Sequence, residues 1–255
     1  MSRRGGLRFI DVHCHLHDEA FDSDRDQVVK RALDNGVEII ITSTLSAQEL
    51  EKALNVAKKY DPVRVSIGFN PLNLSALDAE EVAREARRLR DKIVAIGEVG
   101  LDFFYVKGVG REKQIEIFRF WINVASELKL PLVVHSRSAG RYALEVLLEE
   151  GYDRVLMHAF DGGSGWALRG VSRGFMFSIP PSVMRSQQKV KLVKCIPIEH
   201  LMVESDAPVL GPEPGKRNEP SNVVVSATKI AEIKKMDLNE VCEKLHSNSK
   251  DFFKL

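Results

Sequence analysis

Short apolar runs alternate with amphipathic stretches along most of the chain. The apolar runs are rich in β-branched residues, as is typical of buried strands. The stretches between them repeat apolar residues at three- and four-residue spacing, which favours helices with one buried face. The pattern predicts eight strands, within residues 8–13, 37–42, 63–69, 92–100, 130–136, 153–160, 174–180 and 199–208. Each strand but the last is followed by a predicted helix, within residues 24–36, 47–60, 79–90, 111–129, 140–151, 164–172 and 187–195.

This alternation predicts a single-domain (β/α)8 TIM barrel over residues 1–255. Strands that are apolar along their whole length are buried on both faces, as in a parallel sheet. A doubly wound open sheet is the alternative. The polar residues favour the barrel, because they follow the strand ends, and only a closed barrel brings all of those ends round one mouth.

Composition and charge narrow the class of protein. A hydrophobic content of 44% over 255 residues is enough for one large core. The 37 basic and 36 acidic side chains nearly cancel, whereas a protein that wraps a long duplex has a net basic surface. A nucleic-acid partner is therefore expected to make only local contact.

Three cysteines, Cys14, Cys195 and Cys242, are too few and too widely spaced for a disulfide framework or a thiolate metal site. Residues 1–13 are basic but lack the apolar segment of a signal peptide, and no apolar stretch is long enough to span a bilayer. We expect a cytoplasmic protein without a membrane partner, either a monomer or a weak oligomer.

Candidate metal ligands follow the predicted strands. His13 and His15 end the first strand, and side chains two apart on a strand point to the same face at roughly 6.5 Å Cα spacing. Four more nitrogen or oxygen ligands follow other strands: Glu98, His135, His158 and Asp206. A mixed imidazole and carboxylate set suits Mn²⁺, Zn²⁺ or Mg²⁺. His17 lies beyond the strand, so we expect it to face solvent or to support the ligands from behind.

Six motifs, in order along the chain, carry a resemblance to a known family: IDVHCH (10–15), IGEVGLD (96–102), PLVVHSR (131–137), MHAFDG (157–162), ESDAP (204–208) and GKRNEP (215–220). Their order resembles that of the TatD-type metal-dependent deoxyribonucleases, a branch of the amidohydrolase-like TIM barrels. The resemblance runs from about Phe9 to the NSKDFF segment at residues 248–253.

The resemblance implies a hydrolase that uses two divalent ions to cleave phosphodiesters. The implied assignment places one ion on His13, His15 and Asp206, a second on His135 and His158, and Glu98 as the bridge between them. Glu98 and Asp206 are then the catalytic carboxylates, and Asp206 would orient or deprotonate the attacking water. The alternative for Asp206 is a helix cap or turn residue ahead of Pro208.

Three basic residues are candidates for binding substrate phosphate. Lys216 and Arg217 lie in the loop after Asp206, and Arg137 lies two residues beyond His135. The alternatives are ordinary exposed basic residues, or, for Arg137, pairing with a carboxylate. The aromatic residues 103–105 are able to stack a base or to cap the barrel.

The chain departs from the family pattern at three positions. Relatives often have histidine where Asn70 stands, glutamate where Ser138 stands, and tyrosine where Val209 stands. None of these is a metal-ligand position. The departures therefore bear on substrate fit, cleavage rate or an auxiliary acid.

Three functions are compatible with the sequence. The first is a deoxyribonuclease that works from a 3′ end or on a single strand, because a recessed mouth and a neutral surface suit a strand end. The second is a barrel hydrolase of small amides or lactones, although many of those bridge their metals with a carboxylated lysine where this chain has Glu98. The third is a non-catalytic binding protein, which would be expected to have lost ligands, and none is lost.

Overall fold

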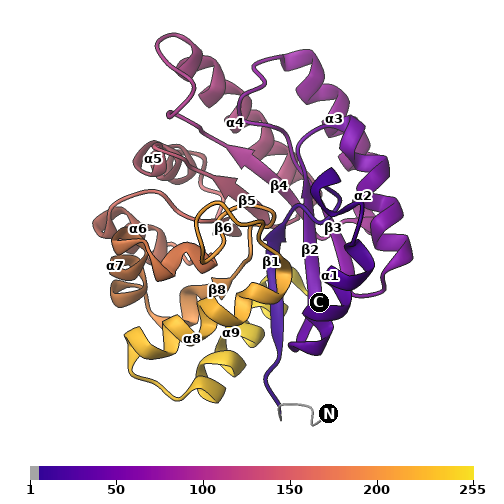
Figure 1. Ribbon diagram of the computed structural model, residues 1–255. Helices are drawn as coiled ribbons and strands as arrows, with labels where there is room; N and C mark the ends of the chain where they lie inside the picture. Colours follow the sequence, from indigo (N-terminus) through magenta and orange to yellow (C-terminus); the bar gives the residue numbers. More distant parts are fainter. Residues whose placement is uncertain (1–5) are drawn as a thin grey trace.

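The computed structural model describes residues 6–255, and within them eight parallel strands form one sheet in sequential order. The strands are β1 (Phe9–Cys14), β2 (Val37–Thr44), β3 (Val63–Ile67), β4 (Ala95–Gly100), β5 (Leu132–His135), β6 (Val155–Met157), β7 (Met176–Ile179) and β8 (Leu201–Val203). Figure 1 shows the strands at the centre and the helices outside them. The predicted TIM barrel is confirmed, and the open-sheet alternative is wrong.

Nine α-helices lie within the described residues. They are α1 (Arg25–Asp34), α2 (Ala47–Lys59), α3 (Ala76–Arg88), α4 (Gly110–Leu128), α5 (Gly140–Glu150), α6 (Ser164–Val171), α7 (Gln187–Cys195), α8 (Val223–Lys234) and α9 (Leu238–Phe253). Short 3₁₀ helices occur at η1 (Glu19–Phe21), η2 (Arg90–Lys92), η3 (Pro181–Met184), η4 (Ile198–His200) and η5 (Pro220–Asn222). Two helices that were not predicted, α8 and α9, follow β8 after a long loop.

Local sequence sets several helix boundaries. Ser75 caps α3 by accepting a hydrogen bond from the backbone N–H of Asp78 at 3.1 Å. Asp237 caps α9 in the same way, accepting from two backbone N–H groups. Gly36 follows α1 with φ +85°, a conformation in which a Cβ would meet the backbone oxygen of Leu7.

The apolar core has two layers. Inside the barrel lies a cluster that includes Ile10, Val12, Val133 and Leu156, and Phe253 of α9 packs against it. A larger layer fills the space between strands and helices, and Cys14 belongs to it. Cys14 therefore points away from the barrel interior, as predicted. Val12, two residues earlier, lies inside because the pairing register between β1 and β2 shifts between Asp11 and Cys14.

Two backbone hydrogen bonds close the barrel between its first and last strands. The N–H of Asp206 donates to the carbonyl of His13 at 2.9 Å, and the N–H of His15 donates to the carbonyl of Ala207 at 2.7 Å. The segment after β8 is thereby aligned with the end of β1. This seam brings Asp206 beside His13 although the two are far apart in sequence.

No helix in residues 6–255 is both long and apolar enough to cross a membrane. The prediction that the N-terminus lacks a signal peptide falls partly on residues 1–5, which lie outside the described residues.

Candidate metal centre

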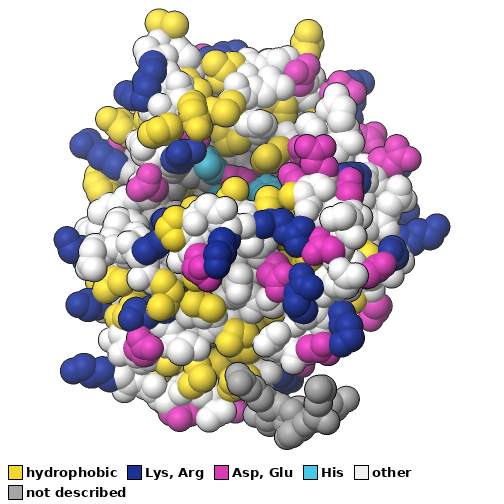
Figure 2. All heavy atoms as spheres, viewed as in Figure 1, with side chains coloured by type: hydrophobic (Ala, Val, Ile, Leu, Met, Phe, Trp, Pro, Cys, Tyr) yellow, Lys and Arg dark blue, Asp and Glu magenta, His cyan; other side chains and the backbone are white. Residues whose placement is uncertain are grey.

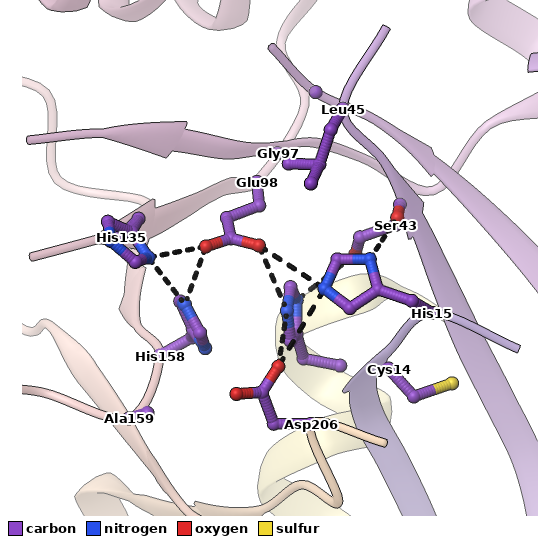
Figure 3. A network of polar contacts seen from close by, with 12 residues as sticks. Cys14, His15, Ser43, Leu45, Gly97, Glu98, His135, His158, Ala159 and Asp206 are labelled. Carbon is purple, nitrogen blue, oxygen red and sulfur yellow. Dashed lines mark hydrogen bonds and ion pairs between the residues drawn. The ribbon is translucent and has the colours of Figure 1, made fainter. Parts of the chain in front are cut away.

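The six predicted ligands converge at one end of the barrel. Glu98 of β4 lies between two pairs of imidazoles (Figure 3). Its Oε1 is 2.5 Å from Nδ1 of His135 and 3.1 Å from Nε2 of His158. Its Oε2 is 3.4 Å from Nε2 of both His13 and His15. Each carboxylate oxygen thus faces a different pair of nitrogen donors.

Asp206 completes the side of the site formed by β1. Its Oδ1 lies 3.4 Å from Nε2 of His13 and 3.7 Å from Nε2 of His15. The backbone of Asp206 has φ +53°, a left-handed conformation that is uncommon for residues other than glycine. Such conformations persist where the surrounding structure enforces them, here through the bond from its N–H to His13.

The donor set fits divalent cations. Three groups of side chains each offer ligand atoms within 4.8 Å of one another: His13, His158 and Asp206; His13, His15 and Glu98; and Glu98, His135 and His158. Nε2 of His13 is buried without a hydrogen-bond partner within the described residues. A buried nitrogen of this kind is costly unless something binds it, and a cation between these donors would do so.

The carboxylates control the protonation of the histidines. Burial lowers the pKa of His158, but Glu98 and Glu204 outweigh that effect and raise the pKa to about 10. His135 behaves similarly, since Glu98 and Asp102 outweigh the effect of burial and raise its pKa to about 9. Burial and the charge of His158 lower the pKa of His13, while the nearby carboxylates of Asp206 and Glu98 raise it to about 9. The site without metal therefore binds protons where cations would sit.

Further polar groups orient the ligands from behind. His13 Nδ1 is 3.1 Å from Oγ of Ser43, and His15 Nδ1 is 2.8 Å from the backbone carbonyl oxygen of Ser43. Asp102 Oδ2 is 3.1 Å from Nε2 of His135. Such contacts fix ring orientation and which nitrogen would face a bound metal.

Glu204 has a comparable place behind His158. Its buried carboxylate accepts hydrogen bonds from Oγ of Ser178 at 2.6 Å and from the N–H of Ala159 at 2.8 Å, and its Oε2 is 3.4 Å from Nδ1 of His158. Ser43, Asp102 and Glu204 were not predicted. Asp102 and Glu204 do carry a signal, because each is a carboxylate within a motif that also contains a ligand.

His17 is buried rather than facing solvent. Its Nδ1 lies 2.9 Å from Oγ1 of Thr42 and its Nε2 lies 3.2 Å from Oε2 of Glu49. Its ring centroid is 6.2 Å from that of His15. His17 therefore belongs behind the ligands, the second of the two positions expected for it.

The three positions that depart from the family pattern lie in the loops above the strands. Asn70 Oδ1 accepts a hydrogen bond from the N–H of Leu72 at 2.9 Å. The N–H of Ser138 donates to Asp161 Oδ2 at 2.7 Å, and Val209 is an exposed hydrophobic residue. Each has a place in a loop at the mouth and none belongs to the six converging ligands.

The candidate phosphate-binding residues have different partners. Arg217 donates to both carboxylate oxygens of Asp24, at 2.7 and 2.6 Å. Lys216 pairs with Glu213 at 2.6 Å. Arg217 also lies 4.9 Å from the ring centre of Phe21. Arg137 contacts the rings of Phe104 and Tyr105 and has no carboxylate partner within residues 6–255. Figure 2 shows histidine atoms at the bottom of a hollow, with basic side chains near its edge.

Comparisons with known proteins agree with this geometry. The sequence model of the family described as "TatD related DNase" matches residues 10–254. Deoxyribonuclease TATDN3 of Homo sapiens is 38% identical, over 98% of this chain and 96% of that protein. The uncharacterized metal-dependent hydrolase YabD of Bacillus subtilis is 34% identical, over 96% of this chain and 99% of that protein. The crystal structure of YjjV, a TatD homologue from Escherichia coli, superposes with a TM-score of 0.91 and 26% identity, covering 98% of this chain and 99% of that one. The chain therefore belongs to the TatD-related DNase family.

Proposed function

We propose that the protein is a metal-dependent deoxyribonuclease that hydrolyses phosphodiester bonds of DNA, acting on a single strand or from a 3′ end. The observation that carries the proposal is the position of Glu98, whose two oxygens face separate pairs of histidines. A carboxylate in that position suits a bridge between two cations. Membership of a family that includes a human deoxyribonuclease supports DNA as the substrate.

Two divalent ions, Mg²⁺, Mn²⁺ or Zn²⁺, are the proposed cofactors. The proposed ligands are His13, His15 and Asp206 for one ion, His135 and His158 for the other, and Glu98 for both. When bound, two such ions neutralise phosphate charge and lower the pKa of a water nucleophile. Their carboxylate and imidazole ligands match the preferences of these metals.

Asp206 is the proposed proton acceptor. Burial alone raises its pKa, but the close contact with His13 and the charges of His158 and His13 hold the pKa below its usual range. The carboxylate is therefore ionised, and only Oδ1 faces the histidines of β1. The second oxygen remains available to orient a water and to take its proton.

Glu98 is ionised for a similar reason. Burial raises its pKa, whereas the positive charges of His158 and His135 outweigh this effect and hold it well below its usual range. An ionised carboxylate at the centre of four imidazoles gives the site its negative charge. We propose that this charge, together with that of Asp206, selects cations of charge two over monovalent ones.

Arg137, Lys216 and Arg217 are the proposed phosphate-binding residues. They lie in the loops after β5 and β8, which surround the same mouth. Lys216 and Arg217 are paired with carboxylates, so phosphate binding there requires the substrate to share or displace Glu213 and Asp24. We also propose that residues 1–255 act as one domain, in the cytoplasm, as a monomer or weak oligomer.

The proposal is tested with chelated protein that is supplied with Mg²⁺, Mn²⁺ or Zn²⁺ in turn. A single-stranded oligonucleotide labelled at its 5′ end should give a ladder that shortens from the 3′ end. The same oligonucleotide with a nuclease-resistant 3′-terminal linkage should survive, and the Glu98→Gln variant serves as the control for contaminating nucleases. Hydrolysis of a small lactone or amide, with DNA left intact under all three metals, would overturn the proposal.

A further inference from the structure

Three exposed side chains form a cluster beside the metal centre: Phe104, Tyr105 and Arg137. The guanidinium carbon of Arg137 lies 4.2 Å from the ring centre of Phe104 and 5.0 Å from that of Tyr105. The two rings meet edge to face, with centroids 4.8 Å apart. Phe104 is 50% exposed and Tyr105 is 58% exposed. These rings therefore do not cap the barrel from within, because the loop after β4 holds them in solvent.

Asp102 connects this cluster to the metal centre. Its Oδ2 contacts His135, while its Oδ1 accepts hydrogen bonds from the backbone N–H groups of Phe104 and Tyr105, both at 3.0 Å. Phe103 donates its backbone N–H to the carbonyl of Arg137 at 2.9 Å. One carboxylate and one backbone pairing thus fix the cluster relative to a metal ligand.

The cluster has the chemistry of a nucleotide-binding surface. Aromatic faces stack nucleobases, and an arginine is able to lie against an aromatic ring while its N–H groups bind phosphate. Within residues 6–255, Arg137 forms no ion pair, so those N–H groups are available to an anion from outside. We propose that Phe104, Tyr105 and Arg137 form a stacking platform for an unpaired nucleobase next to the phosphate that is cleaved. This inference rests on the proposed deoxyribonuclease function.

The platform would give the enzyme a preference for unpaired nucleotides. In a duplex both faces of a base are covered by its neighbours, so a base must leave the stack before it meets a protein ring. A frayed end or a single strand meets that requirement at little cost. The stacking platform would therefore exclude internal positions of a duplex, without any contact that reads sequence.

More aromatic surface continues away from the platform. The ring of Phe103 lies 5.1 Å from that of Tyr142, which is 43% exposed at the start of α5. Arg141 lies 5.8 Å from the ring of Tyr142 and 5.5 Å from that of Trp166 in α6. Alternating rings and guanidinium groups of this kind suit several successive nucleotides of one strand.

The experiment compares binding of two anionic chains with the same number of phosphates. One is a fluorescent oligothymidylate of about ten nucleotides, and the other is a chain of abasic tetrahydrofuran phosphates. Binding is measured by anisotropy in EDTA, which prevents turnover. The parent protein should prefer the chain with bases by about tenfold per stacked base. The Phe104→Leu/Tyr105→Leu double variant should lose the part of that preference supplied by the two rings, about tenfold per stacked base, and keep its affinity for the abasic chain.

A matched control removes an aromatic ring at the other end of the barrel. Phe252 also lies near an arginine, with the guanidinium carbon of Arg154 6.0 Å from its ring, so Phe252→Leu makes the same chemical change away from the mouth. This variant should keep the base preference of the parent. Arg137→Lys, which retains the charge but not the planar group, should keep abasic binding and lose part of the preference. Melting temperatures verify that all variants are folded.

The outcomes separate this inference from the function on which it rests. Equal affinity of the parent for both chains, or a base preference as strong in the double variant as in the parent, overturns the stacking platform. Cleavage of the oligothymidylate with added metal is measured independently. Cleavage without base preference overturns the platform alone, and base preference without cleavage under any metal supports the platform and overturns the nuclease.

Discussion

Each side of the barrel mouth carries an arginine, but the two arginines have different partners. After β8, Arg217 donates to both oxygens of Asp24, and its neighbour Lys216 pairs with Glu213. After β5, Arg137 rests against the rings of Phe104 and Tyr105. In Figure 2 hydrophobic side chains gather at the upper left of the hollow, while acidic ones are prominent to its right.

This difference determines which basic side chains are free to bind an anionic substrate. A phosphate that approaches Arg217 competes with a carboxylate already in place, so much of the new interaction replaces an old one. A ring satisfies the face of a guanidinium but not its charge or its N–H groups. The side of the mouth at β4 and β5 should therefore contribute more to substrate affinity than the side at β8 and β1.

The largest effect is expected from changing Glu98, which lies in the middle of the candidate metal centre between the two sides of the mouth. Glu98→Gln keeps the shape of the side chain but not the charge, so the amide cannot bridge two cations. Turnover of single-stranded DNA should fall about a thousandfold or more, because metal activation supplies several kcal/mol to such reactions. The measurement is cleavage at saturating metal, with circular dichroism to verify the fold. Turnover equal to that of the parent would show that the Glu98 carboxylate is not needed for cleavage.

The next effect compares the two arginines directly. Arg137→Ala should weaken binding of single-stranded DNA about ten- to a hundredfold, as expected for a charge-assisted bond of roughly 1.5–3 kcal/mol, and should make the salt dependence shallower. Arg217→Ala should cost only about twofold, because the charge of Asp24 already offsets it. Affinities are measured at two salt concentrations. Arg173→Ala, which removes a charge paired with Asp153, is the control for net charge.

A larger loss in Arg217→Ala than in Arg137→Ala would reverse the comparison. It would mean that substrate displaces Asp24 and that the aromatic side of the mouth is structural.

A rise in pH should change metal binding at the centre of the site without changing the charge of the arginines on either side of the mouth. His13, His135 and His158 have pKa values raised to about 9, 9 and 10 without metal, so at pH 7 they hold protons that a metal must displace. Metal affinity should therefore rise by about tenfold per pH unit for each proton released, until pH approaches 9. The arginines of the mouth keep their charge throughout this range.

Isothermal titration calorimetry in two buffers of different protonation enthalpy measures this proton release. Identical heats in both buffers at pH 7 would contradict the raised pKa values.

The smallest effect is expected from Asp24→Asn, which removes the carboxylate partner of Arg217 and so makes the β8 side of the mouth more like the β5 side. The hydrogen bond from Arg217 is the main cause that lowers the pKa of Asp24, which is therefore ionised at neutral pH. Asp24→Asn removes that charge and frees Arg217 for phosphate, so DNA affinity should rise about two- to fivefold. The same change at Asp153, far from the mouth, is the control. Unchanged affinity in Asp24→Asn would show that Arg217 does not reach the substrate.

The barrel and the six candidate metal ligands were accessible from sequence because each leaves a local pattern. Strands buried on both faces are apolar throughout, and a histidine or carboxylate at the end of such a strand has few structural reasons to be there. His13, Glu98 and His158 follow that rule. Helices α8 and α9 were both missed. The apolar residues of α8 begin as a run, VVV at 223–225, rather than as a stripe, whereas α9 does carry a stripe that was left without a prediction.

What the sequence did not provide is the identity of distant partners. Arg217 and Lys216 resemble phosphate-binding residues by motif, and the pairing of Arg217 with Asp24 joins segments from opposite ends of the chain. Asp102 orients His135 across two adjacent strands. Such pairs depend on how the loops meet after folding, which no local periodicity encodes.

The seam between the first and eighth strands also governs when activity can arise during synthesis. His13 is made early and Asp206 late, yet they share one side of the site and are joined by a backbone hydrogen bond. A nascent chain that has emerged only as far as β7 already holds five of the six proposed ligands but lacks Asp206, the proposed proton acceptor. The order of translation thus delays nuclease activity until the last strand has docked on the first.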